Sequence, residues 1–200
     1  MRTNYVLVDF ENVQPSSLEA LAHDHFKLLV FVGASQTKVP FETAASLQLL
    51  GARAEYIKIT GNGSNALDFH IAYYIGKLAA ADPTAYFHIV SKDTGFDPLL
   101  QHLKTSGIFA GRVKAVADIP LVRASTAKTP TERNHVALAW LQQTKATRPR
   151  TVKTLSSTIA SVFQKQLSEE QVASIVQWLA EHGHLEINGT KVSYSARGEA

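Results

Sequence analysis

The sequence has no cysteine among its 200 residues. Disulfide frameworks, zinc sites built from thiolates and cysteine nucleophiles are therefore excluded. Long hydrophobic runs are lacking as well, since none approaches the roughly 20 apolar residues that a helix needs to cross a membrane. The chain enters its first apolar stretch without a basic leader or a cleavage site. We therefore expect a cytoplasmic protein that does not bind membranes.

A strong excess of one charge is also missing from the whole chain, but the charge is unevenly distributed. Residues 1–120 carry 10 Lys and Arg against 11 Asp and Glu, a net charge of −1. Residues 121–200 carry 10 Lys and Arg against 6 Asp and Glu, a net charge of +4. The basic second part favours a polyanionic partner such as a nucleic acid, although basic surfaces also serve solubility alone.

Apolar segments of strand and helix character alternate along the first part of the chain. The expected elements are strand 5–8, helix 15–25, strand 27–32, helix 40–50, strand 54–59, helix 66–81, strand 86–90, helix 96–105 and strand 113–116. Such alternation forces parallel strands joined by right-handed crossovers. The predicted fold class is therefore α/β, with a doubly wound, five-stranded parallel sheet.

Polar side chains follow two of the expected strands. Asp9 ends the first strand, Asn12 lies in the turn after it, and Asp93 follows the fourth strand. If the first and fourth strands are neighbours, their carboxyl ends form the crevice in which open α/β sheets bind ligands. The sequence thus predicts that Asp9 and Asp93 meet at one sheet edge, with Asn12 orienting Asp9 or a bound water.

Two further acids lie in first turns of expected helices. Asp68 and Asp97 each fit a capping box, in which the acid serves the helix terminus only. Asp68, however, shares a helix face with Ile71 and Ile75, and this apolar face must pack on the sheet. A carboxylate that points inward needs a partner. We therefore expect Asp68 to point into the crevice, whereas for Asp97 both interpretations stay open.

Clustered carboxylates require a cation, because their mutual repulsion otherwise raises their pKa values. Oxygen-only ligands favour Mg²⁺ or Mn²⁺ over zinc or copper. One or two such ions could activate a water and stabilise the charge that develops on a phosphodiester. We expect Glu11 to alternate away from Asp9 and Lys92 to face a substrate phosphate or solvent.

These motifs resemble those of the NYN branch of the PIN-like nuclease superfamily. The likeness covers residues 4–118 and rests on Asp9-Phe10-Glu11-Asn12, Asp68, and the run from Ser91 to Leu100. It implies a Rossmann-like parallel core, Mg²⁺- or Mn²⁺-dependent (endo)ribonuclease activity on single-stranded or structured RNA, metal ligation by Asp9, Asp68, Asp93 and Asp97, and a catalytic role for Asn12. The chain departs from the family pattern at Gly95, where many members carry an acid.

The remaining residues are expected to form a linker and a small second domain. We place the nuclease domain at 1–118, the linker at 119–130 and the second domain at 131–196. Three expected helices, the last opened by a capping box at Ser168, precede a hairpin around Asn188-Gly189. This pattern resembles a winged helix, similar to the LOTUS (OST-HTH) modules that accompany some NYN domains.

The function of the second domain is open between two interpretations. A basic run contains Lys145, Arg148, Arg150 and Lys153, which together with Lys92 are the predicted nucleic-acid-binding residues. Glu169 and Glu170, by contrast, begin the third helix and would repel phosphates there, so binding of a protein partner or self-association is the other interpretation. For the whole chain we predict a metal-dependent ribonuclease, with a non-catalytic RNA-binding adaptor as the alternative.

Overall fold

The computed structural model describes residues 2–15, 18–143 and 148–194. The chain forms two compact units, Met1–Ile119 and Pro120–Ala200. Each unit has a hydrophobic core of its own.

The first unit is built on a parallel sheet with strand order β3-β2-β1-β4-β5. Its helices and strands, in chain order, are β1 (Asn4–Asp9), β2 (Phe26–Val32), α1 (Phe41–Leu50), β3 (Ala54–Lys58), α2 (Ala66–Ala81), β4 (Tyr86–Val90), α3 (Asp97–Thr105) and β5 (Phe109–Val113). The predicted α/β fold with a doubly wound, five-stranded parallel sheet is confirmed.

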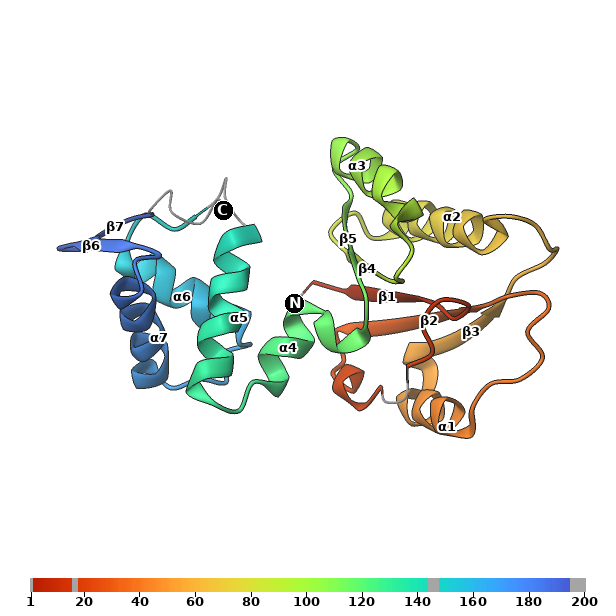
Figure 1. The fold of residues 1–200 in the computed structure, drawn as a ribbon, viewed down its shortest axis with the longest axis horizontal. Coiled ribbons are helices and arrows are strands. Elements are labelled where there is room, and N and C mark those ends of the chain that lie inside the picture. Colours follow the sequence, from red (N-terminus) through yellow and green to blue (C-terminus); the bar gives the residue numbers. More distant parts are fainter. Residues whose placement is uncertain (1, 16–17, 144–147, 195–200) are drawn as a thin grey trace. The chain divides into compact units, whose positions relative to one another are not determined.

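The direction in which successive strands are added to the sheet reverses between the neighbouring strands β1 and β4. Helix α1 covers one face, whereas α2 and α3 cover the other (Figure 1). Strands β1 and β4 are hydrogen-bonded neighbours, and Val8 pairs with Val90 in their register. Asp9 directly follows Val8, and Ser91 directly follows Val90. The two residues therefore lie side by side at the carboxyl edge of the sheet, at its topological switch point.

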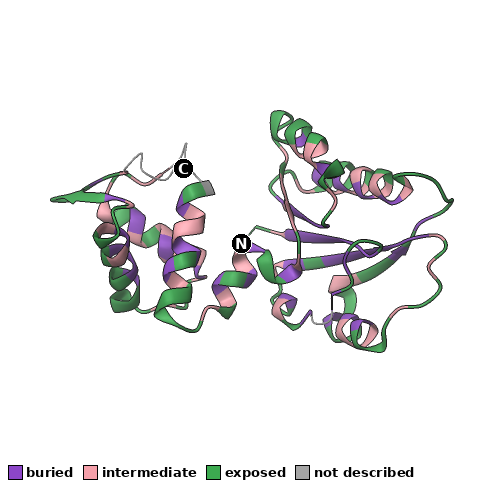
Figure 2. Ribbon diagram, viewed as in Figure 1, coloured by how far each residue is buried: buried purple, intermediate pink, exposed green. Residues whose placement is uncertain are grey.

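The core beneath α2 explains why this edge is rigid. Leu7, Phe31 and Phe87 from the sheet, with Ile71 and Ile75 from α2, are all completely buried. Figure 2 shows the central strands as the most buried part of the unit and the outer faces of α2 and α3 as exposed. Because α2 is anchored by this core, the position of its first turn relative to β1 is fixed.

Two predicted elements of the first unit differ in the structure. A helix is predicted over 15–25, but the residues described between β1 and β2 (10–15 and 18–25) contain only a 3₁₀ turn, Glu19–Leu21. The fifth strand occupies Phe109–Val113 rather than 113–116. Its Gly111 does not break the strand: a Cβ there would lie 2.9 Å from the Tyr86 hydroxyl, so glycine provides room for that ring.

The second unit packs helices against a hairpin. Its elements are α4 (Pro120–Thr126), α5 (Pro130–Gln143), α6 (Val152–Val162), α7 (Glu169–Glu181), β6 (Glu186–Asn188) and β7 (Lys191–Ser193). The segment 119–130, predicted as a linker, instead contains α4, in which Val122 and Ala124 are buried. The expected capping box opens α7, since the Ser168 side chain accepts from the Gln171 amide. Leu155, Ile159 and Leu179 form the centre of this core.

Across the described parts of the chain, no helix combines the length and the apolar character that crossing a membrane requires.

Candidate active site

Asp9 is a buried carboxylate held at the end of β1. Its side chain lies on the α2 face, because side chains alternate along a strand and Leu7 is on that face. It is only 2% exposed. One oxygen, Oδ2, accepts a hydrogen bond of 2.8 Å from the Ser91 hydroxyl, and Oδ1 accepts one of 3.2 Å from the Asn12 backbone amide. These donors give hydrogen-bond partners to a carboxylate that would be costly to bury without them.

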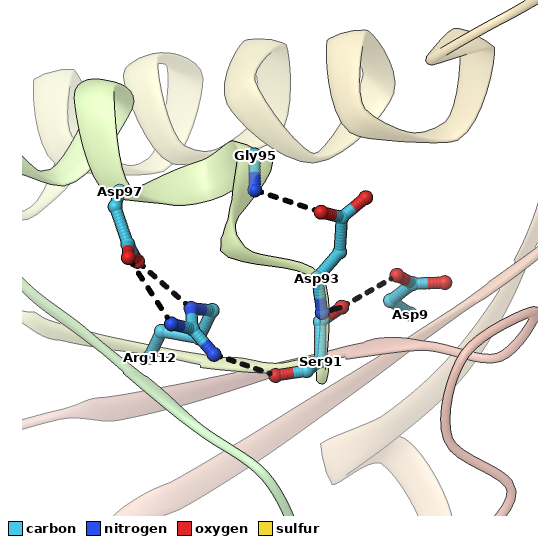
Figure 3. Close-up of polar contacts among 6 residues, drawn as sticks. All are labelled: Asp9, Ser91, Asp93, Gly95, Asp97 and Arg112. Carbon is cyan, nitrogen blue, oxygen red and sulfur yellow. Dashed lines mark hydrogen bonds and ion pairs between the residues drawn. The ribbon is translucent and has the colours of Figure 1, made fainter.

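Ser91 connects Asp9 to Asp93. The hydroxyl that donates to Asp9 also accepts a hydrogen bond of 3.0 Å from the Asp93 amide, and Ser91 is completely buried. Asp93 in turn accepts a 2.7 Å hydrogen bond from the Gly95 amide, which caps the 3₁₀ turn Thr94–Phe96 (Figure 3). Sequence reasoning assigned no role to Ser91, although its place directly after a buried strand in the Ser-x-Asp motif was the available signal.

Asp9, Asp68 and Asp93 line one cavity of about 170 Å³. They come from β1, α2 and the segment after β4, as the sequence predicts for the sheet edge. Asn12 lines the same cavity, but in the structure its backbone amide, not its side chain, donates to Asp9. The remaining lining residues are Glu11, Ala34, Ile59, Gly61, Asn62, Gly63, Asn65, Ala66 and Leu67.

The cavity holds more negative charge than its surroundings neutralise. Burial, together with the negative charges of Asp9, Asp93 and Glu11, raises the pKa of Asp68 to about 6. A carboxylate in the first turn of a helix normally has a lowered pKa. Here Asn65 caps α2 from a left-handed conformation without a side-chain hydrogen bond. Desolvation and repulsion therefore outweigh the helix terminus.

Glu11 also lines this cavity, contrary to the expectation that it alternates away from Asp9. Alternation holds only within a strand, and β1 ends at Asp9, so Glu11 belongs to the following turn. Its carboxylate occupies the space beside Gly33: a Cβ built on Gly33 would lie 1.7 Å from Glu11 Oε1. A larger residue at position 33 would thus displace the Glu11 carboxylate.

The structure does not bring Asp97 to the cavity. Its carboxylate accepts hydrogen bonds from Arg112, of 2.9 Å from Nε and 3.2 Å from Nη2. Arg112 also donates from Nη1 to the Ser91 carbonyl at 3.3 Å (Figure 3). Asp97 therefore forms a bidentate ion pair with Arg112 instead of lining the cavity, and it forms no capping box. Lys92 is exposed and does not line the cavity.

The donor chemistry of the cavity fits a hydrated hard cation. Its charged donors are all carboxylates, which favours Mg²⁺ or Mn²⁺. Among the described residues, no three His, Cys, Asp or Glu side chains lie close enough together to enclose one metal ion. Mg²⁺ commonly keeps several waters and is held by only one or two carboxylates. The arrangement therefore suits such an ion and not one that the protein fully dehydrates.

The predicted basic residues of the second unit divide between two cavities. Arg148 and Arg150 line one cavity beside the hairpin. Lys153 lines another cavity, together with Glu169 of α7. Lys145 lies outside the described residues.

Comparison with known proteins gave one result. A family model described as PIN domain matches residues 3–113, which span the whole sheet and all the carboxylates of the cavity. No match was found among curated proteins or among solved structures.

Proposed function

The chain belongs to the PIN domain family, and on that premise we propose that its first unit is a Mg²⁺- or Mn²⁺-dependent endoribonuclease. PIN domains are generally nucleases and typically depend on divalent metal ions. The Asp-x-x-Asn motif at Asp9 and the Ser-x-Asp motif at Ser91 further support a place in the NYN branch. We expect this enzyme to act on RNA in the cytoplasm.

The observation that carries the proposal is the meeting of Asp9, Asp68 and Asp93 in one cavity at the switch point of the sheet. The three side chains are far apart in sequence and come from different elements. No structural purpose is served by bringing like charges together at the cost of raising the pKa of one of them. Such a cluster is typical of a functional site.

Each residue has a definable task in this proposal. Asp9 is oriented by hydrogen bonds from the Ser91 hydroxyl and the Asn12 backbone amide. Asp93 is fixed by Ser91 and Gly95. Asp68, with a pKa of about 6, is mostly ionised at neutral pH and would offer a second charged ligand. A divalent ion held by these carboxylates would supply an activated water and would offset the charge on the phosphate. Glu11 adds negative charge that strengthens attraction for the cation, and Asp97 holds Arg112 instead of serving as a ligand.

The test is cleavage of single-stranded RNA in the presence of Mn²⁺. We expect Asp9→Asn and Asp93→Asn each to reduce the cleavage rate by at least about 100-fold, because the metal site loses a charged ligand. Glu55→Gln, which removes an exposed carboxylate on β3 outside the cavity, is the matched control and should cleave normally. Unchanged cleavage by both aspartate variants, with melting temperatures like that of the parent, would remove the proposal.

Two observations favour a second candidate, a non-catalytic RNA-binding adaptor. Gly95 stands where many family members carry an acid, and Asp97 is engaged by Arg112. Calorimetric titration with Mn²⁺ separates the two functions. Binding at millimolar affinity or tighter that is lost in Asp93→Ala supports the nuclease, whereas RNA binding without metal binding or cleavage supports the adaptor.

For the second unit we propose a winged-helix module, similar to the LOTUS modules, that binds the RNA. The support is its three helices α5, α6 and α7 followed by the β6–β7 hairpin, together with the basic charge of residues 121–200. Binding of a protein partner or self-association through this unit is the alternative, and acids at the start of α7 favour it.

A further inference from the structure

A basic groove lies beside the hairpin of the second unit. We define it as the cavity of about 790 Å³ lined by Arg148, Arg150, Thr151, Asn188, Lys191, Val192, Ser193 and Tyr194. Three of these residues are cationic and none is acidic. The volume lies within the range of roughly 300–1,000 Å³ that ligand sites occupy. Its charge and size thus fit an extended anion.

Backbone pairing holds the two exposed cations of the groove, Arg150 and Lys191, on adjacent segments. The Val192 amide donates to the Arg150 carbonyl at 2.9 Å, and the Val152 amide donates to the Thr190 carbonyl at 3.0 Å. Between these bonds, Thr151 forms a bridge with Lys191. The residues before α6 therefore extend the hairpin as a third short segment, which fixes the backbone that carries both cations.

Arg148 and Tyr194 form one wall of the groove. Arg148 donates from Nε to the Leu141 carbonyl at 3.0 Å, and its guanidinium lies 5.2 Å from the centre of the Tyr194 ring. The Tyr194 hydroxyl donates to the Pro149 carbonyl at 2.6 Å. Both side chains are thus anchored by α5 and the neighbouring loop, and they place an aromatic ring beside the cations.

The start of α7 is unfavourable for a phosphate, because Glu169 and Glu170 are exposed there and would repel its negative charge. Lys153 shares its cavity with Glu169, so its charge is partly offset there. The favourable surface for a polyanion is therefore the hairpin side, and this division was not visible in the run of basic residues.

We propose that the basic groove binds the phosphate backbone of single-stranded RNA through Arg150 and Lys191, with Tyr194 beside a base. The proposal rests on the ribonuclease function proposed above for the choice of RNA. A flexible strand can bring neighbouring phosphates to two cations while a base meets an aromatic ring, the combination found in single-strand binding sites. Arg148 is a positioning residue that supports the Tyr194 ring.

The experiment measures binding of a fluorescent single-stranded RNA to the full chain carrying Asp93→Asn, over a series of salt concentrations. We expect Arg150→Ala and Lys191→Ala each to weaken binding several-fold. Each should also make the negative slope of log affinity against log salt shallower by about 0.7, which corresponds to the loss of one phosphate contact. Lys128→Ala is the matched control, since it removes an exposed positive charge of the same unit outside the groove, and it should leave both values unchanged. Melting temperatures verify that the exposed substitutions preserve the fold.

Two results would overturn the proposal. One is RNA binding by Arg150→Ala and Lys191→Ala that equals the parent at every salt concentration. The other is an equal loss in Lys128→Ala, which would mean that net charge and not the groove attracts RNA. Failure of the proposed function is distinguishable, because a parent chain that binds RNA through the groove but cleaves nothing with Mn²⁺ would retain this inference and remove the nuclease.

Discussion

Among the cavity carboxylates, Asp68 shows a clearly raised pKa. Its pKa in the folded chain is about 6 against an ordinary value of 3.8, because of burial and the neighbouring carboxylates. The folded state therefore binds a proton more tightly than the unfolded state, and the stabilisation this provides is lost as the pH rises from about 4 to about 6. We expect the melting temperature of the metal-free protein to fall over this window.

Asp68→Asn is the control for this pH dependence. Asparagine has no proton to lose, so the decline in melting temperature between pH 4 and 6 should be flatter in the variant. Glu11→Gln removes one of the charges that raise the pKa of Asp68 and should move the decline to lower pH. An identical pH profile for Asp68→Asn and the parent would show that the decline does not originate at Asp68.

Metal binding should show the opposite dependence on pH. A cation competes with the proton on Asp68, so we expect the affinity for Mn²⁺ to increase between pH 5 and pH 7 and to level off above that. Calorimetric titrations at several pH values measure this directly. Affinity that does not change across the window would place the cation away from Asp68.

Ser91 offers a test of the support beneath the carboxylates. Ser91→Ala removes the hydroxyl that donates to Asp9 and accepts from the Asp93 amide. Partners that orient a metal ligand typically contribute 10–100-fold to metal affinity or activity. We expect a loss of about that size in Mn²⁺ affinity, and Ser91→Thr, which keeps a hydroxyl, should lose less if the extra methyl group is accommodated. Equal affinity for Ser91→Ala and the parent would contradict this role.

At the scale of the elements, Arg112 joins β5 to the start of α3 and to the end of β4. It holds Asp97 through two hydrogen bonds and contacts the Ser91 carbonyl, so it braces the segment that carries Asp93. The side chain of Arg112 is 15% exposed and that of Asp97 49% exposed. An ion pair of this exposure contributes up to about 1 kcal/mol.

The ion pair between Arg112 and Asp97 predicts that substitutions of Asp97 and Asp93 have different effects on stability and on metal affinity. We expect Asp97→Asn to lower the free energy of unfolding by up to about 1 kcal/mol while leaving Mn²⁺ affinity within a few-fold of the parent. Asp93→Asn should do the reverse, with a large loss of affinity and little loss of stability. A loss of Mn²⁺ affinity in Asp97→Asn as large as that in Asp93→Asn would restore Asp97 as a ligand.

The sheet and the meeting of Asp9 with Asp93 could be predicted because both follow from strand order. Buried strands such as β1 are recognisable in sequence, and right-handed crossovers leave few ways to connect them. Asp68 could be predicted from the helical period alone. The place of Glu11 in the cavity could not be predicted. The expected alternation of side chains holds only as far as Asp9, where β1 ends, and the sequence does not mark the residue at which strand pairing stops.

Segments whose structure depends on contacts distant in sequence were the ones mispredicted. Leu18 and Leu21 suggest a helix, but the described part of this segment forms only a 3₁₀ turn, and both side chains are nevertheless buried. Residues 119–130 have a Ser, Thr, Ala and Pro composition typical of linkers. They form α4 because Val122 and Ala124 are buried in the folded chain, which no local pattern indicates. Asp97 was ambiguous for the same reason, since Arg112 lies on another strand.

At the scale of the whole molecule, the chain divides into a first unit that carries the carboxylate cavity and a second unit that is basic. Each has its own core, at Leu7 and Phe31 in one and at Leu155 and Leu179 in the other. We expect residues 1–119 and 120–200, expressed separately, each to melt cooperatively. The first fragment should bind Mn²⁺ as the full chain does but cleave RNA with a higher KM, and the second should bind RNA without metal. Loss of Mn²⁺ binding in a folded first fragment would contradict this division.

The central claim is that the carboxylates at the switch point form a divalent metal site. Crystals grown with Mn²⁺ test it most directly, because anomalous diffraction locates the ion independently of any activity. We expect an anomalous peak inside the cavity lined by Asp9, Asp68 and Asp93, with waters completing the coordination of the ion. A cavity without a peak at millimolar Mn²⁺, or a peak bound only elsewhere on the chain, would contradict the account.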